Sequence, residues 1–214
     1  MHTECITPTA LKVLKKFKET ILAHEFVLAG GTAIALRLGH RKSVDFDFFT
    51  ERAFSTDKLF RKIRLLDIEV QTLQEEQGTL TLAANDVKVS FFHSPYPFLD
   101  EKTSLNGVPV AGLIDIASMK VLAITQRGAK RDFVDLAFIL QDIPFTKIAL
   151  NMIGRFGADR INPVVIGKAL VYFHDAESDP EPEYLTRRKD WKTIKRFFAD
   201  HVQQFVLDLH RAKV

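Results

Sequence analysis

The first segment of the chain carries apolar residues at helical spacing. The side chains that share one helical face are Leu11, Leu14, Phe17 and Ile21. Thr7 is a good N-cap residue, and Pro8 follows it at the first helical position, where a proline is well tolerated. The pattern therefore predicts a helix that begins at residue 8 and stops near residue 24.

A strand, a tight turn and a second helix are predicted next. Residues 26–29 form a short apolar run that ends in Gly30-Gly31, after which residues 32–38 return to helical spacing. Residues 44–49 then alternate carboxylate and aromatic side chains, which is typical of a strand with two different faces.

The following part of the chain predicts more sheet. Ser55 or Thr56 caps a helix that runs to about residue 66. Residues 68–92 contain runs rich in Val, Leu, Thr and Phe, punctuated by turns near residues 77–78 and 85–86. We expect these runs, and a short segment at 108–111, to be strands of the same mixed sheet.

Beyond residue 112 the pattern is persistently helical. The predicted helices cover residues 113–126, 132–141, 146–155, 163–173 and 190–213, and an acidic linker with two prolines at 175–183 precedes the last of them. The fold class expected is α+β, with a mixed-sheet domain over residues 1–110 and a helical lobe packed on it over residues 111–214.

Composition changes this picture little. Hydrophobic residues make up 46% and charged residues 27% of the chain, as in ordinary folded globular proteins. The single cysteine, Cys5, excludes an intramolecular disulfide, and the sequence opens with no secretory signal. Charges interrupt every apolar stretch before it reaches the length of a bilayer span. We therefore expect a cytoplasmic protein that does not cross a membrane.

Charge alone does not identify a partner. The net charge is only +3, although basic residues cluster at residues 12–18, 127–131 and 187–196. Such clusters are usually solvated helix faces. The alternative, which the charge count leaves open, is contact with a phosphate backbone or a triphosphate.

Candidate chemistry lies in the segment from Gly30 to Asp47. Glycines allow a backbone to approach a phosphate closely, and the N-terminus of the following helix attracts the anion. Asp45 and Asp47 are two residues apart on a predicted strand, so both project from one face. Paired carboxylates repel each other unless a cation lies between them, and Mg²⁺ prefers such oxygen ligands with open positions for phosphates.

The same residues carry a resemblance to known enzymes. Gly30-Gly31 followed by Asp45-Phe46-Asp47 resembles the signature of the DNA polymerase β-like nucleotidyltransferases. The wider stretches 29–33, 39–41 and 43–49 are similar, more narrowly, to the AbiEii/AbiGii toxin family. Lys120 on an apolar helix and the run at 130–136 resemble later motifs of that family, so the resemblance covers roughly residues 26–140.

The resemblance implies a function and a set of roles. Family members are toxins of type IV toxin–antitoxin and abortive-infection systems, and the best understood transfer nucleotides, some onto tRNA 3′ ends. It implies a Mg²⁺-dependent enzyme that uses an NTP, an RNA acceptor and a cognate antitoxin protein. The implied catalytic residues are Ser43, Asp45, Asp47, Lys120, Asp132 and Asp135; the implied metal ligands are Asp45 and Asp47; and the implied nucleotide-binding residues are Gly30, Gly31, Thr32, Arg41 and Lys120.

One position departs from the superfamily pattern. Polymerase β-like enzymes usually carry a third carboxylate on a later strand, and the corresponding inward position here is Ser90. A serine cannot replace a carboxylate as a base or as a charged ligand. Either Asp132 or Asp135 supplies the missing group, or catalysis is weak or lost.

Other interpretations of these residues stay open. Gly30-Gly31 alone would be a simple turn, Lys120 alone a surface lysine, and Asp132 with Asp135 a surface ion-pair cluster. At the level of function, the alternatives to RNA modification are a non-catalytic nucleotidyltransferase-like binding module and an enzyme that nucleotidylates a protein. The histidines show no zinc-ligand spacing, and no hydrolase triad is visible.

Overall fold

The computed structural model describes residues 1–186 and 188–214. Arg187, in the third basic segment, lies outside the described residues. The chain forms two compact units. The sheet unit comprises Met1–Pro97 and Glu101–Ala111, and the helical unit comprises Phe98–Asp100 and Gly112–Val214.

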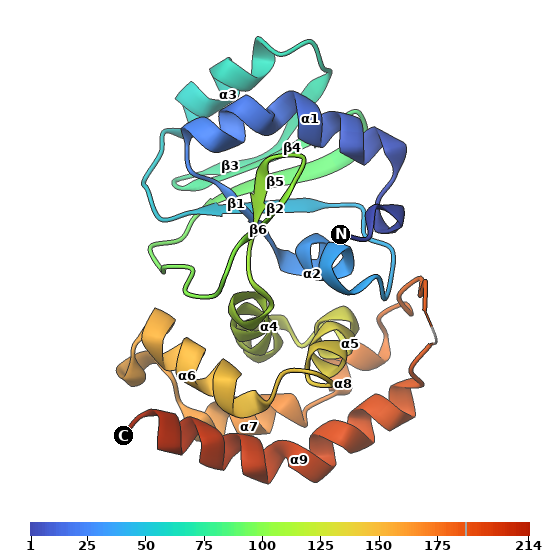
Figure 1. The fold of residues 1–214 in the computed structure, drawn as a ribbon, viewed down its shortest axis with the longest axis vertical. Helices are drawn as coiled ribbons and strands as arrows, with labels where there is room; N and C mark the ends of the chain where they lie inside the picture. Colours follow the sequence, from blue (N-terminus) through green and yellow to red (C-terminus); the bar gives the residue numbers. More distant parts are fainter. Residues whose placement is uncertain (187) are drawn as a thin grey trace. The chain divides into compact units, whose positions relative to one another are not determined.

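The sheet unit contains a seven-stranded mixed sheet with the strand order β3-β4-β5-β2-β1-β7-β6 (Figure 1). Central strand β2 runs antiparallel to β1 and parallel to β5, and β1 runs parallel to β7. The other neighbours pair antiparallel. The strands are β1 (Val27–Ala29), β2 (Phe46–Thr50), β3 (Val70–Glu76), β4 (Thr79–Ala84), β5 (Val87–His93), β6 (Thr103–Leu105) and β7 (Val108–Val110).

Helices cover the sheet on both faces. Helices α1 (Pro8–Ala23) and α3 (Thr56–Arg64) lie along one face, and α2 (Gly30–Leu38) lies on the other (Figure 1). The short 3₁₀ helix η1 (Thr3–Cys5) precedes α1. Thr7 caps α1 by accepting from the backbone N–H of Ala10, so the predicted capping interaction is confirmed.

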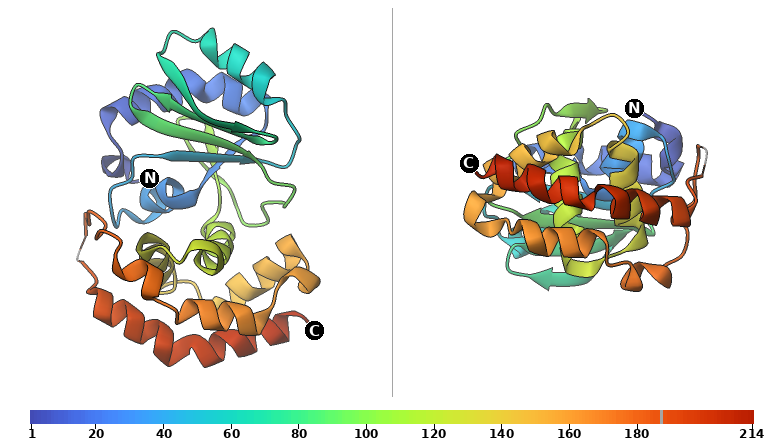
Figure 2. Two further views of the ribbon diagram at one scale, coloured as in Figure 1. Left: turned by 180° about the vertical axis from the view of Figure 1, so that it is seen from behind. Right: turned by 90° about the horizontal axis from the view of Figure 1, so that it is seen from below.

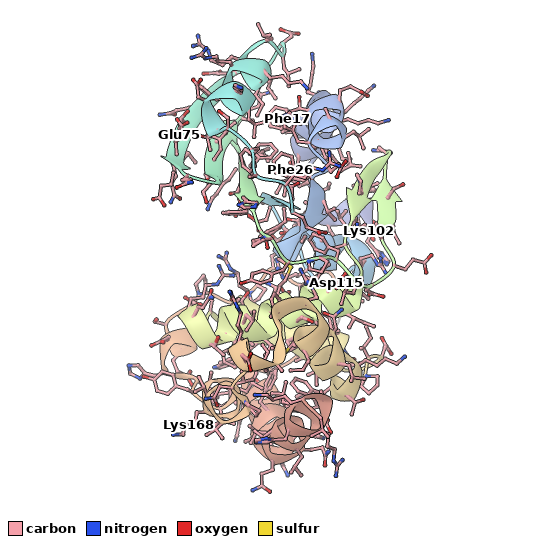
Figure 3. All side chains as sticks on the ribbon, turned by 90° about the vertical axis from the view of Figure 1, so that its left-hand side faces the viewer. Phe17, Phe26, Glu75, Lys102, Asp115 and Lys168 are labelled. Carbon is pink, nitrogen blue, oxygen red and sulfur yellow. The ribbon has the colours of Figure 1, made fainter. Side chains whose placement is uncertain are left out.

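Aromatic side chains fill the core between the sheet and α1. Phe91 on β5 contacts Phe17 of α1, Phe26 and Phe48, with ring centroids 6.1, 4.9 and 5.5 Å away. Figure 3 labels Phe17 and Phe26 on this side of the sheet. Burial of these large rings supplies much of the apolar area that stabilises the unit.

The helical unit is built around α4, which packs against α5, α6 and α7. The last helix, α9, packs against the same three helices (Figure 2). The helices of this unit are α4 (Leu113–Arg127), α5 (Lys130–Ile139), α6 (Phe145–Phe156), η2 (Ala158–Arg160), α7 (Pro163–Leu170), α8 (His174–Glu177) and α9 (Trp191–Ala212).

Hydrogen bonds to the buried carboxylate of Asp115, on α4, hold the segment Phe98–Asp100 against these helices. Asp115, labelled in Figure 3, is fully buried and accepts from the backbone N–H groups of Leu99 and Asp100 at 3.1 and 2.9 Å. Asn151 Nδ2 donates to the same carboxylate at 2.8 Å. Because a buried carboxylate requires such partners, these contacts explain why three residues between β5 and β6 belong to the helical unit.

The predicted α+β class is confirmed, and most predicted elements are present. Three details differ. The strand predicted at 44–49 begins only at Phe46, β6 was not predicted, and the helix predicted at 163–173 ends at Leu170. The short helix α8 then begins before the predicted linker at 175–183 and occupies its first residues. Short, partly exposed elements such as β6 carry little periodic signal, which is why the sequence pattern missed them.

Candidate active site

The turn between β1 and α2 brings Gly30 against Asp47. Ala29 pairs with Asp47 across the antiparallel β1–β2 ladder. The backbone of Gly30 has a φ of +67°, and a Cβ atom built on it would lie 2.6 Å from Oδ2 of Asp47. Glycine is therefore required twice, once for the backbone conformation and once for the close approach of the carboxylate.

Side chains alternate between two faces from Asp45 to Thr50. Phe46 and Phe48 are buried, whereas Asp45 and Asp47 are partly exposed. Asp47 lies within β2, and Asp45 immediately precedes that strand. The alternation places both carboxylates on the face that carries α2, opposite the aromatic core.

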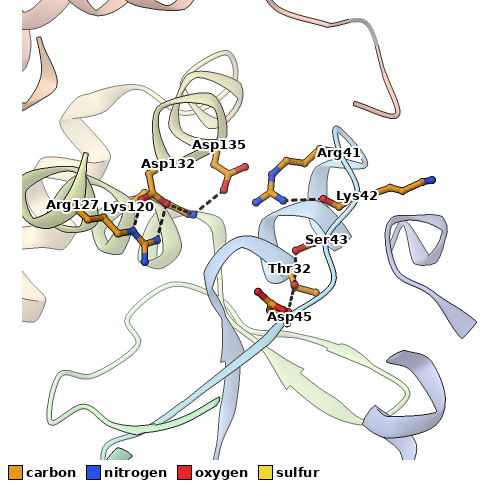
Figure 4. A network of polar contacts seen from close by, with 9 residues as sticks. All are labelled: Thr32, Arg41, Lys42, Ser43, Asp45, Lys120, Arg127, Asp132 and Asp135. Carbon is orange, nitrogen blue, oxygen red and sulfur yellow. Dashed lines mark hydrogen bonds and ion pairs between the residues drawn. The ribbon is translucent and has the colours of Figure 1, made fainter. Parts of the chain in front are cut away.

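Two hydroxyl groups connect the start of α2 to the segment before β2. Thr32 Oγ1 lies 2.6 Å from Ser43 Oγ and also donates to the backbone carbonyl of Asp45 (Figure 4). Next to them, the mostly buried Arg41 donates from Nη1 to the Lys42 carbonyl at 2.9 Å. Thr32, Ser43 and Asp45 thus belong to one hydrogen-bonded group, and Gly31 lies with Thr32 in the first turn of α2.

Ser90 lies beside Asp47 on the neighbouring strand. The two residues are Cα partners in the parallel β2–β5 ladder, so their side chains point to the same side. Ser90 is buried and accepts a hydrogen bond from Thr81 Oγ1 of β4 at 3.4 Å. The position next to Asp47 therefore holds a pair of hydroxyl groups.

Sequence reasoning missed Thr81, although a signal for it was present. The turn at Asn85-Asp86 is two residues long, so counting outward from it along the hairpin pairs residue 81 with residue 90. A polar side chain at the buried position opposite Ser90 could have been found in this way.

A second polar cluster lies inside the helical unit. Lys120 Nζ lies 2.7 Å from Oδ1 of Asp132 and 2.8 Å from Oδ2 of Asp135. Arg127 binds Asp132 with both Nε and Nη2, at 2.8 and 3.0 Å (Figure 4). The side chains of Asp132 and Asp135 are fully buried, so the interpretation of these carboxylates as a surface cluster is wrong. Lys120 is also buried, so the interpretation of it as a surface lysine is wrong too.

The two cations determine the protonation state of Asp132. Burial by itself would raise the pKa of this carboxyl, but Lys120 and Arg127 outweigh that effect, and the pKa is lowered. Asp132 therefore carries its negative charge at neutral pH, and its ion pairs offset the cost of burial.

Asp45 and Asp47 are side chains of the chemical type that holds a magnesium ion with few protein ligands. Across residues 1–186 and 188–214, no group of three or more His, Cys, Asp or Glu side chains is arranged to hold a metal. Mg²⁺ commonly binds through only one or two carboxylates and takes further oxygens from substrate phosphates and water. Asp45 and Asp47, on the face that bears the α2 N-terminus, match that requirement.

Comparison with known protein families identifies the family of the chain. A family model described as "Nucleotidyl transferase AbiEii toxin, Type IV TA system" matches residues 12–86 and 84–208. The chain belongs to the AbiEii family. The AbiEii match covers most of both units, so the resemblance seen in the sequence motifs extends over nearly the whole chain.

Proteins similar to this AbiEii chain are found in several bacteria. An uncharacterized protein of Aquifex aeolicus is 37% identical over 199 residues, which cover 91% of this chain and 95% of that protein. The fold resembles MenT4, a nucleotidyltransferase toxin of Mycobacterium tuberculosis, with a TM-score of 0.56, 18% identity and coverage of 97% and 94% of the two chains. JHP933 from Helicobacter pylori gives a TM-score of 0.55 at 16% identity, with coverage of 96% and 95%. The nucleotidyltransferase fold is therefore established.

The helices of the AbiEii chain include no membrane-spanning candidate. Within the part of the chain that the structure describes, none is both long enough and apolar enough to cross a bilayer.

Proposed function

We propose that this AbiEii protein transfers a nucleotide from an NTP to an acceptor hydroxyl group in a Mg²⁺-dependent reaction. The observation that carries the proposal is the close approach of the Asp47 carboxylate to Gly30 at the start of α2. It puts a metal-binding type of side chain beside backbone amides that suit a phosphate.

The chain's own groups have distinct tasks in this proposal. The first N–H groups of α2, including those of Gly31 and Thr32, have no acceptor within the helix and bind phosphate oxygens. Asp45 and Asp47 would hold Mg²⁺, which neutralises charge on the phosphates when bound. Thr32 and Ser43 keep the segment before β2 in place through their shared hydrogen bonds. Catalysis then consists mainly of positioning and charge neutralisation, and Arg41 adds positive charge next to Ser43.

We further propose that the acceptor is RNA, with a tRNA 3′ end as the specific candidate. Membership of a toxin family of type IV toxin–antitoxin systems supports an acceptor of general importance to the cell, together with a cognate antitoxin. The sequence pI of about 8.9 is compatible with a polyanionic partner such as RNA. We expect the reaction to take place in the cytoplasm.

One observation favours a second candidate function. Ser90 provides a hydroxyl where a third carboxylate would adjoin Asp47, so the sheet unit lacks a side chain that could act there as a general base. A chain of this kind could retain nucleotide binding without transfer. The second candidate is therefore a non-catalytic nucleotide-binding module.

A labelling experiment separates these functions. Purified protein is incubated with each α-³²P-labelled NTP, Mg²⁺ and total RNA, and the RNA and protein fractions are then resolved on gels. Label in RNA that disappears with Asp47→Asn supports the proposal, whereas label in protein identifies a protein acceptor. NTP binding without any labelled product would identify the binding module.

The matched control for this experiment is Asp67→Asn. Asp67 is an exposed carboxylate of the sheet unit that pairs with Lys16 at 3.3 Å, far along the chain from the β1–α2 turn. Exposed ion pairs contribute little to stability, so this variant should label RNA as the wild type does.

A further inference from the structure

A pocket on the helical unit lies where the C-terminal ends of α4 and α7 meet α8. Its volume is about 310 Å³, at the lower end of the range of small-molecule sites. The lining includes two cations, one aromatic ring and one carboxylate, which are Arg127, Lys168, Tyr172 and Asp175. None of them except Arg127 belongs to the polar clusters described above.

Arg127 is held in a fixed orientation at this pocket. Its guanidinium binds Asp132 through two nitrogen atoms, and Asp132 is itself held by Lys120. Although Asp132 is fully buried, the Arg127 side chain is 54% exposed. The buried cluster therefore ends at the surface in a pre-oriented guanidinium, which is well suited to bind a phosphate group.

The charge of the lining selects among phosphate ligands. Lys168 and Asp175 contribute opposite charges to the lining, and Arg127 shares its positive charge with Asp132 through their ion pair. The positive charge left for a ligand is therefore no more than one phosphodiester group requires. It is too small for a triphosphate, so the lining favours one unit of a nucleic-acid strand over a free NTP.

Tyr172 adds a surface on which a base can stack. Tyr172 lies two residues beyond the end of α7 and is 55% exposed, and Lys168 of α7 precedes it by four residues (Lys168 is labelled in Figure 3). A ring that remains exposed beside cations is the usual arrangement by which proteins hold unpaired bases.

We propose that this pocket binds one nucleotide of a single-stranded segment of RNA. Arg127 and Lys168 bind its phosphodiester, and Tyr172 stacks on its base. The inference rests on the proposed function, because it assigns the helical unit a part in holding the RNA acceptor.

Direct binding measurements test the pocket without relying on transfer. Fluorescence anisotropy would follow a short 5′-fluorescein-labelled single-stranded RNA titrated with the whole chain, without NTP, at several salt concentrations. The variants are Tyr172→Ala and Lys168→Ala, because both side chains are exposed and neither holds a buried group. Arg127→Ala is avoided because it would remove a partner of the buried Asp132. Lys147→Ala, which removes an exposed lysine of α6, is the control.

The expected results differ in kind between the variants. Tyr172→Ala should weaken binding by at least about fivefold, with no change in the salt dependence, because stacking involves no counterion. Lys168→Ala should reduce the slope of log K against log salt by about 0.7, the value for one phosphate contact on a single strand. Lys147→Ala should change neither quantity.

Other results would contradict the proposal that this pocket binds a nucleotide of RNA. If Tyr172→Ala binds RNA with wild-type affinity, the pocket does not hold a nucleotide. Lys168 and Arg127 would then only stabilise their own helices, by interacting with the partial negative charge at the helix C-termini. Absence of RNA binding by the wild type would have the same consequence. If the wild type labels RNA but Tyr172→Ala binds RNA normally, only the proposal that the pocket binds a nucleotide is wrong. If the label enters protein instead, the proposal that RNA is the acceptor is wrong.

Discussion

Oδ2 of Asp47 lies 2.6 Å from the position that a Cβ atom would take on Gly30. The carboxylate and the first residue of α2 are thus packed so closely that the geometry of one depends on the other. This dependence leads to a prediction about the glycine itself.

Gly30→Ala should abolish nucleotide transfer and lower stability. The new methyl group would displace the Asp47 carboxylate, and an alanine with the φ of +67° found at Gly30 costs about 1–2 kcal/mol. A change of this size lowers Tm by about 2–8 °C in a chain of this length. Thermal unfolding and the RNA-labelling assay would measure the two effects.

Gly157→Ala provides the matched control. Gly157 also has a positive φ, +85°, but a Cβ atom there would meet nothing within 4 Å. Because its ψ of 145° also lies in a region that other residues rarely adopt, the variant should lose at least as much stability and retain transfer. If both alanine variants label RNA equally well, contact between Gly30 and Asp47 has no catalytic importance.

Asp45→Asn should separate activity from stability. Removing one of two neighbouring negative charges relieves repulsion in the metal-free site, so Tm should stay the same or rise. Transfer should fall below detection, because an amide is a poor substitute for a charged magnesium ligand. Transfer at the wild-type rate would show that Asp45 is not a ligand.

The buried cluster of the helical unit predicts a stability effect. Asp132→Asn leaves Lys120 and Arg127 without the carboxylate that both of them bind. Breaking a buried ion pair costs on the order of 3 kcal/mol. Asp200→Asn removes an exposed carboxylate that pairs with Arg196 and should cost well under about 1 kcal/mol. Equal losses in the two variants, measured by urea denaturation, would contradict this account of the cluster.

The same cluster predicts a pH dependence. Since the pKa of Asp132 is lowered in the folded state, its contribution is fully present above the unfolded pKa of about 3.9. It is lost as the pH falls through the folded pKa. The difference in unfolding free energy between wild type and Asp132→Asn should therefore be constant near neutral pH and shrink below about pH 4. A difference that persists unchanged into acid would exclude this carboxylate as its source.

The local parts of the fold could be predicted from the sequence, and the buried polar contacts could not. The Thr7 cap and the Asn85-Asp86 turn depend on residues adjacent in the chain, and both appear as expected. Burial of Asp132 depends on Lys120, which belongs to a different helix. The fastening of residues 98–100 depends on Asp115 and on Asn151, 36 residues further on. Periodicity identifies which face of a helix is apolar, but it does not identify which charges meet inside the unit.

Ser90 allows the most direct test of how the site relates to three-carboxylate enzymes. Because Ser90 is the Cα partner of Asp47, Ser90→Asp should place a third carboxylate next to the proposed magnesium ligands. Without metal, the buried extra charge should lower Tm, since it repels Asp47 and displaces the hydroxyl contact with Thr81.

Added Mg²⁺ should reverse this loss. A ligand that binds only the folded state stabilises it in proportion to the logarithm of its concentration over Kd. The rise in Tm with Mg²⁺ should therefore be larger in Ser90→Asp than in the wild type. Ser90→Asn, which has nearly the same size without the charge, should lose stability and show no enhanced response to Mg²⁺. Identical responses of the Asp and Asn variants would mean that position 90 does not face the metal. If Ser90→Asp also labels RNA where the wild type does not, the wild-type site is a binding module that lost its third carboxylate.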